Sequence, residues 1–279
     1  MALTEMAPAS SVADDDDAVR PAWYTTRLGR TSLTLLVFIG LLGCWTAYVR
    51  VMGLSPLILP TPLMVWESLV ENTLNGLLPM HAWTTLTEII LGFLLGCALG
   101  ITLGVITAQS ELMRTILGPY ILASQAMPKL ALAPIMVVWL GFGIAPKVVI
   151  TALVCFFPLL ENTIIGLTST NSYQLELFRA LTAKNWQTFL KLRIPSALPV
   201  IFAGLRVAIT LAVVGAVVGE YVGANKGLGA LVIVTQGNFD TPLMFAIFVY
   251  LTVIGIVLYN ILEWLESTYI AWRYIKRGD

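Results

Sequence analysis

The sequence predicts an all-α, polytopic membrane protein with about six transmembrane helices. Hydrophobic residues make up 58% of the 279-residue chain and charged residues only 11%, a balance far too apolar for a water-soluble domain. Nearly uncharged blocks long enough to cross a bilayer core recur six times. These blocks are 33–49, 89–108, 115–142, 148–168, 199–219 and 243–262. The formal net charge is zero, which gives no indication of nucleic acid or another strongly charged partner.

The two ends of the chain differ in composition from this apolar middle. We expect residues 1–30, which include the acidic run Asp14–Asp17, to form a disordered cytoplasmic tail. No small-residue cleavage site is visible at a suitable place, so we expect the first apolar block to be retained as a span. Residues 31–272 then form the membrane domain, and residues 273–279 form a short cytoplasmic tail.

The second apolar block contains a stripe of small residues. Glycine recurs at every fourth position on one helix face, at Gly92, Gly96, Gly100 and Gly104. Small residues at this spacing let the backbone of another helix come close. We favour packing within the chain over a subunit interface, because the pattern is common in membrane helices.

The third apolar block is interrupted by prolines at positions 119, 128 and 134. Proline removes a backbone hydrogen bond and clashes with the preceding turn. We therefore expect this block to be kinked or partly interfacial rather than a straight rod.

The distribution of lysine and arginine predicts the orientation of the chain in the membrane. With the N-terminus in the cytoplasm, eleven basic residues lie inside and only Arg50, Lys147 and Lys226 lie outside. This asymmetry agrees with the positive-inside rule. Residues 173–199, which join the fourth and fifth blocks, are then cytoplasmic.

Residues 173–199 are unusually polar for a connection between spans and read as two short helices. Leu177 and Leu181 lie at helical spacing in the first helix, and Trp186 belongs to an apolar stripe in the second. Asn185 is the expected N-cap of the second helix, and Pro195 is expected to end it. A basic, amphipathic helix pair between spans indicates a docking element for a partner.

Four ionisable residues within or beside the apolar blocks are candidates for the solute pathway or for intramembrane ion pairs: Lys129, Glu161, Arg206 and Glu88. A charge at membrane depth faces a cavity or an opposite charge by default. Lys129 equally fits an interfacial side chain that extends to water. Glu88 and Glu161 are the candidates to neutralise Lys129 or Arg206, and the sequence leaves the pairs open.

The remaining residues give no sign of catalysis or of metal binding. His81 precedes a span and fits an interfacial position. The three cysteines, Cys44, Cys97 and Cys155, lie in apolar blocks and fit small core residues. No phosphate-binding loop, catalytic triad, zinc pattern or paired carboxylates are readable. We expect no catalytic residue, no metal and no cofactor in this chain, so uphill transport needs a partner or an ion gradient.

The helix-pair segment resembles the "EAA" loop, E-A-A-x3-G-x9-I-x-L-P, of the membrane subunits of bacterial binding-protein-dependent ABC importers. Matches elsewhere, such as Pro60-Thr61-Pro62 and Phe156-Phe157-Pro158, resemble the sulfonate, taurine and nitrate branch (NitT/TauT-like) of that family. We call residues 173–198 the coupling loop. The resemblance implies that its ATPase-coupling residues are Glu176, Arg179, Leu181, Thr182, Ala183, Trp186, Leu192, Ile194 and Pro195. The two alanines of the pattern are replaced by Leu177 and Phe178, and the turn glycine is replaced by Thr182.

The resemblance implies a type I ABC importer permease with the MetI-like fold, in the bacterial inner membrane with both termini cytoplasmic. It implies a homodimer of permeases in the lipid bilayer, separate ABC ATPase subunits that hold ATP and Mg²⁺, and an external substrate-binding protein. A sulfonate, taurine or nitrate-like anion is the favoured solute. A pyrimidine or thiamine precursor, riboflavin or an aromatic acid is the alternative. A gradient-driven secondary transporter or channel with Lys129, Glu161 and Arg206 as an ion relay is a further alternative.

Overall fold

The computed structural model describes residues 27–270, and the two tails expected from the sequence fall mainly outside this range. The described residues form helices and contain no β-strand. The chain divides into two compact units after Gly53. The first unit contains one described helix, α1 (Arg27–Val51), whose apolar side chains are mostly exposed. This helix is long and apolar enough to cross a membrane by itself.

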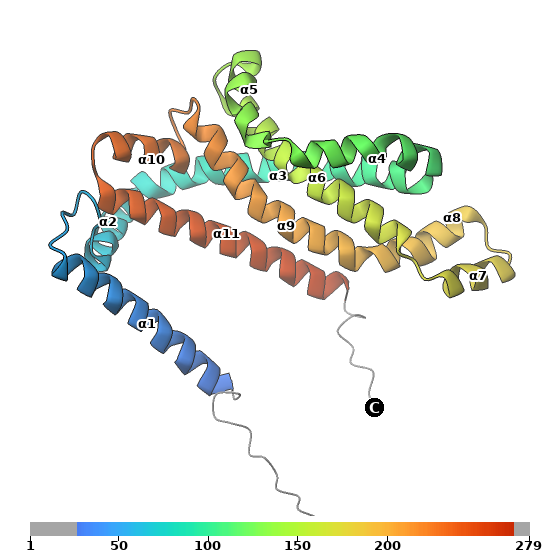
Figure 1. Ribbon diagram of the computed structural model, residues 1–279, viewed down its shortest axis with the longest axis horizontal. Helices are drawn as coiled ribbons and strands as arrows, with labels where there is room; N and C mark the ends of the chain where they lie inside the picture. Colours follow the sequence, from blue (N-terminus) through green and yellow to red (C-terminus); the bar gives the residue numbers. More distant parts are fainter. Residues whose placement is uncertain (1–26, 271–279) are drawn as a thin grey trace, which may run out of the picture. The chain divides into compact units, whose positions relative to one another are not determined.

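The second unit is a bundle built on three long helices. These are α3 (Leu77–Gln109), α6 (Ile144–Thr168) and α9 (Ile194–Tyr221), and α11 (Thr241–Tyr269) packs beside α9 (Figure 1). One apolar core cluster joins α3, α6, α9 and α11. A second cluster joins α3, α10 (Leu228–Gly237) and α11. Cys97 and Cys155 lie in the first cluster, as expected of small core residues, whereas Cys44 on α1 is exposed.

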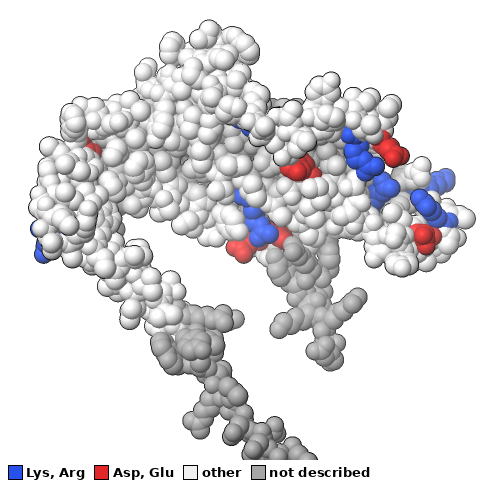
Figure 2. All heavy atoms as spheres, in the orientation of Figure 1, with Lys and Arg blue, Asp and Glu red and all other residues white. Residues whose placement is uncertain are grey.

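Short helices lie at the two ends of this bundle. Figure 1 shows α7 (Ser172–Ala180) and α8 (Asn185–Thr188) at one end, and α2 (Pro62–Leu74) with α10 at the other. Thr61 caps α2, since its hydroxyl accepts a hydrogen bond from the backbone N–H of Met64 at 3.4 Å. On the face drawn in Figure 2, charged side chains gather at the end that carries α7 and α8.

The proline-rich third block forms a broken segment. It consists of α4 (Glu111–Ala126), the 3₁₀ helix η2 (Lys129–Leu132) and α5 (Ala133–Leu140), with a bend of 83° between the parts. Pro128 lies directly in the break, where it cannot donate a backbone hydrogen bond. The kink predicted from the prolines is present. With this pair counted as one span, the described residues contain up to six apolar segments that could cross a membrane.

The glycine stripe of α3 packs against α6. A Cβ atom added at Gly96 would lie 2.7 Å from the carbonyl oxygen of Ala152, and one at Gly100 would lie 2.8 Å from that of Phe156. Gly92 and Gly104 meet Thr151 and Thr163, also on α6, in the same way. The stripe therefore lies against α6 of the same chain, and a Cβ atom at any of the four positions would come too close to that helix.

Candidate functional site

The coupling loop exposes its first half to the surroundings. Glu176 and Arg179 on α7 are exposed, and so are Leu181 and Thr182 in the turn that follows. Large apolar side chains are exposed there as well, at Tyr173 (80%), Leu177 (56%) and Trp186 (57%). An apolar surface of this kind on a polar loop is typical of a contact with another protein.

The second half of the loop packs into the bundle. Leu192 is buried, and Ile194 and Pro195 are half-buried. Ala183 is half-buried as well, in the turn between the two helices. The predicted coupling residues therefore separate into an exposed group on α7, α8 and the turn between them and an anchoring group at residues 192–195, just before and at the start of α9.

The turn after α7 is a Schellman motif with threonine at the position where glycine is usual. The N–H of Thr182 donates to the carbonyl of Arg179 at 2.9 Å, and the N–H of Ala183 donates to that of Phe178 at 3.0 Å. Thr182 has φ = 52°, in the left-handed region. A β-branched residue thus replaces the turn glycine of the EAA pattern, and the chain still forms the left-handed turn.

Two details of the second helix differ from the sequence-based prediction. The N-cap is Lys184 rather than Asn185, and the Lys184 N–H donates to the Gln187 side chain at 2.8 Å. Pro195 does not end the helix, because α8, the π-helical turn η3 (Phe189–Arg193) and α9 form one helical segment from Asn185 to Tyr221. The wider turn of η3 precedes Pro195, which then occupies the first turn of α9, where its missing N–H costs little.

Lys129 and Glu161 lie on the partly exposed surface around the break between α4 and α5. The Glu161 carboxylate accepts a hydrogen bond from Gln125 Nε2 at 2.8 Å. The Lys129 Nζ lies 4.5 Å from the ring centroid of Phe157, a cation–π contact. Both charged side chains are half-buried. The described residues therefore place an ammonium, a carboxylate, an amide and an aromatic ring on α4, η2 and α6.

The ion pairs differ from those that the sequence suggested. Arg206 Nη2 on α9 lies 2.9 Å from Glu266 Oε2 on α11. Glu88 Oε1 on α3 lies 2.6 Å from Lys147 Nζ on α6, and both side chains are buried. The prediction that Glu88 neutralises Lys129 or Arg206 is therefore wrong, because Glu88 pairs with Lys147 inside the bundle. Lys147 itself, which the charge distribution places outside the membrane, is buried.

A buried polar network surrounds Glu88 at the α10 end of the bundle. The Glu220 carboxylate interacts with Glu88 and accepts hydrogen bonds from Thr85 Oγ1, at 2.7 Å, and from the Gly229 N–H. Thr85 Oγ1 accepts the Leu228 N–H at 2.7 Å. These contacts satisfy backbone N–H groups at the start of α10, where a carboxylate also complements the helix dipole.

His81 belongs to this network rather than to an interface. It is buried, and its Nδ1 lies 2.8 Å from the carbonyl oxygen of Gly227. Sequence reasoning missed the network, although the spacing of His81, Thr85 and Glu88 along one helix face was a usable signal. Their polarity lowered the apparent hydropathy of the span, so the second block was expected to begin at 89 whereas α3 begins at Leu77.

Comparisons with known proteins agree with this arrangement. Residues 100–270 match the family model described as "Binding-protein-dependent transport system inner membrane component". The chain is 38% identical over 238 residues to a formylaminopyrimidine transport permease protein of Halalkalibacterium halodurans, covering 85% of this chain and 94% of that protein. It is 30% identical over 238 residues to a putative aliphatic sulfonates transport permease protein of Bacillus subtilis, covering 85% and 86%.

A solved structure supports the fold independently. An inward-facing form of the MetNI methionine ABC transporter matches with a TM-score of 0.56 at 20% identity, covering 71% of this chain and 95% of that chain. The family model spans more than half of this sequence. The chain therefore belongs to the family of binding-protein-dependent transport system inner membrane components and is a multi-pass permease subunit of an ABC importer in the inner membrane.

Proposed function

We propose that the coupling loop, residues 173–198, transmits movement from an ABC ATPase subunit to the spans. The observation that carries this proposal is the division of the loop into an exposed apolar surface and a buried anchor. Tyr173, Leu177 and Trp186 are available to a partner, whereas Leu192 holds the loop to the bundle. A partner that moves α7 and α8 thus acts directly on the core.

The continuous helix from α8 to α9 supplies the mechanical connection. It runs 37 residues from Asn185 to Tyr221, about 55 Å at the rise of an α-helix. Glu220 near its far end holds the start of α10. A displacement at α8 is therefore carried to the opposite end of the bundle, which fits rigid-body alternating access.

The proposed assembly contains two copies of this chain, a pair of ATPase subunits on the coupling-loop side and a substrate-binding protein on the other side. ATP and Mg²⁺ belong to the ATPase subunits. The cytoplasm is then the compartment that the α7–α8 end faces, and both termini are cytoplasmic. The positive-inside distribution of Lys and Arg supports this orientation.

The solute is proposed to be small and polar. Lys129 favours a small anion such as a sulfonate, taurine or a nitrate-like ion, and one of the relatives is named for aliphatic sulfonates. The Gln125–Glu161 pair, with Phe157 one helical turn from Glu161 on α6, favours the second candidate, a nitrogen heterocycle, since an amide and a carboxylate accept its N–H groups and an aromatic ring stacks with it. The relative named for formylaminopyrimidine supports the second candidate. Uptake of taurine and of an aminopyrimidine, measured side by side with the assembled importer, distinguishes the two.

The coupling proposal is tested by substitutions at Glu176 and Trp186. The chain is co-expressed with candidate ATPase subunits. Co-purification of the ATPase is measured on the detergent-extracted complex, and ATP turnover is measured after reconstitution in liposomes. Glu176→Ala with Trp186→Ala is expected to weaken ATPase binding by about 2 kcal/mol or more, roughly a 30-fold loss of affinity. Trp139→Ala, at an even more exposed tryptophan on α5, is the control. Unchanged binding and turnover in the double variant would remove the coupling loop from the ATPase contact.

A further inference from the structure

Two adjoining polar cavities lie between the coupling loop and the ends of the spans. Their volumes are about 260 and 230 Å³, and both are bordered by Gln109 and Arg193. Gln109 ends α3, and Arg193 ends η3. The second cavity is also bordered by Arg114 on the first turns of α4. The second cavity is also bordered by Leu167 and Thr168, so the cavities lie at the ends of α3 and α6.

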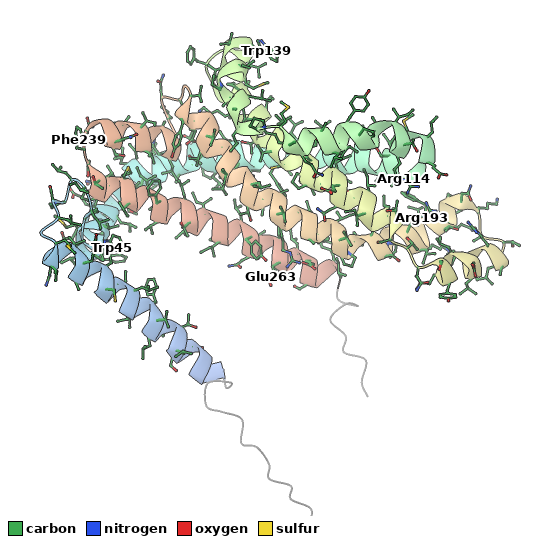
Figure 3. The ribbon with its side chains drawn as sticks, viewed as in Figure 1. Trp45, Arg114, Trp139, Arg193, Phe239 and Glu263 are labelled. Atoms are coloured by element: carbon green, nitrogen blue, oxygen red, sulfur yellow. The ribbon has the colours of Figure 1, made fainter. Side chains whose placement is uncertain are left out.

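The two arginines give this region its positive charge. Among residues 27–270, neither Arg114 nor Arg193 forms an ion pair, since the two pairs found there involve Lys147 and Arg206. Glu111 is the acidic residue on the border of the second cavity. Figure 3 labels Arg114 and Arg193 at the same end of the bundle. Two guanidinium groups beside one cavity are suited to a phosphate group, which they bind through paired N–H donors.

An apolar groove continues from the same arginine towards the middle of the bundle. It has a volume of about 230 Å³, is bordered by Arg114, and runs between α4 and α6 past Gly118 and Leu122 until it reaches Gln125 and Glu161, the pair considered above for the solute. Residues 114 to 125 of α4 span about 16 Å along the helix axis. The space beside Gly118 is open, since a Cβ atom there would meet nothing within 4 Å.

We propose that this combined site binds one anionic phospholipid of the leaflet on the coupling-loop side. The phosphodiester lies between Arg114 and Arg193, the polar headgroup occupies the cavities beside Gln109, and an acyl chain enters the groove at Gly118. Basic pockets between membrane helices bind acidic lipid headgroups, because the positive side chains attract the negative phosphate. A lipid accounts for both halves of the site, whereas a free phosphate or an acidic side chain of the ATPase would fill the polar half alone.

The bound lipid would connect the coupling loop to the spans. Arg193 belongs to the helix that continues into α9, and Arg114 belongs to the broken segment that carries Lys129. A phosphate held by both arginines joins these two elements without a direct ion pair between protein side chains. The site therefore adds a lipid contact to the segment that transmits movement.

The test measures lipid retention by the purified full-length chain. The protein is reconstituted in nanodiscs with equal amounts of phosphatidylglycerol and phosphatidylcholine, extracted into detergent and examined by native mass spectrometry. The wild-type chain is expected to retain phosphatidylglycerol in preference to phosphatidylcholine. Arg114→Gln with Arg193→Gln is expected to reduce this retention roughly tenfold. Lys191→Gln, which removes an exposed positive charge two residues from Arg193, is the matched control and is expected to retain the lipid.

A second variant separates the acyl chain from the headgroup. Gly118→Phe fills the groove without changing any charge, so it is expected to reduce phosphatidylglycerol retention while both arginines remain. It also provides a test if the double arginine variant fails to fold. Equal retention by wild type, the arginine variant and Gly118→Phe would overturn the proposal. Binding of inorganic phosphate with no loss in Gly118→Phe would assign the site to a free anion. Loss of ATPase co-purification with unchanged lipid retention would assign the arginines to the partner protein.

Discussion

Thr182 shows how a single residue can retain a turn that its side chain disfavours. Its φ of 52° lies in the left-handed region, and the Schellman hydrogen bonds around it are complete. A β-branched residue in this region costs on the order of 1–3 kcal/mol. The sequence predicted the position of this turn from the family's glycine. It could not predict that the chain would adopt the glycine conformation with threonine.

Thr182→Gly is expected to stabilise the chain by about 1 kcal/mol, because relief of the left-handed strain exceeds the added backbone entropy of the unfolded glycine. The free energy of unfolding, measured on the purified protein in detergent, checks this. Thr188→Gly is the control, since Thr188 has a helical φ of −60° and glycine there is expected to destabilise the helix. Destabilisation by both substitutions would contradict the assignment of strain to Thr182.

Lys147 is the cation of the buried network that includes Glu88 and Glu220. Lys147→Met is expected to lower the free energy of unfolding by about 3–5 kcal/mol, because a buried carboxylate is left without its partner. Lys226→Met, at an exposed lysine, is expected to change stability little. The double variant Lys147→Met, Glu88→Met is expected to recover part of the loss. If the double variant loses as much stability as Lys147→Met alone and Glu88→Met alone lose together, direct pairing of Lys147 with Glu88 is contradicted.

At the scale of elements, the close contact between α3 and α6 depends on glycine. Gly100→Ala is expected to destabilise the bundle by about 1–3 kcal/mol, because the new methyl group meets the Phe156 carbonyl oxygen and Leu159. Gly255→Ala on α11 is the control, since its Cβ would lie 3.9 Å from Val213 in ordinary contact. Unfolding of both variants under the same conditions measures the difference. An equal effect at the two positions would contradict the close packing of α3 on α6.

The sequence predicted the apolar helices better than their ends and partners. Hydropathy located the spans, and the prolines around position 128 predicted the break in the third one. The start of α3 was misplaced because His81, Thr85 and Glu88 look like loop residues until Lys147 and Gly227 are brought beside them by the fold. Pro195 was read as a helix end because the π-helical turn before it leaves no clear mark in the sequence. Local patterns thus predict helices, whereas buried polar pairs depend on contacts between distant segments.

At the scale of the whole molecule, the bundle has two distinct ends, with α7 and α8 at one and α2 and α10 at the other (Figure 1). The proposed orientation places the first end in the cytoplasm. With Cys44 replaced by alanine, Gln174→Cys is expected to react with a membrane-impermeant maleimide only in inside-out vesicles. Asn238→Cys, in the connection between α10 and α11, is expected to react in intact spheroplasts. Both native positions are exposed, so accessibility depends on the side of the membrane. The reverse pattern would invert the topology.

The buried network also has a consequence for the order in which the protein is made. Glu88 precedes its lysine partner by 59 residues, and Thr85 precedes Glu220 by 135. During synthesis, α3 therefore enters the bilayer with a carboxyl group whose partners have not yet left the ribosome. Helix α3 can complete its packing around the buried network only after Gly229 has emerged. A nascent chain stopped before that residue is therefore expected to remain associated with the insertion machinery.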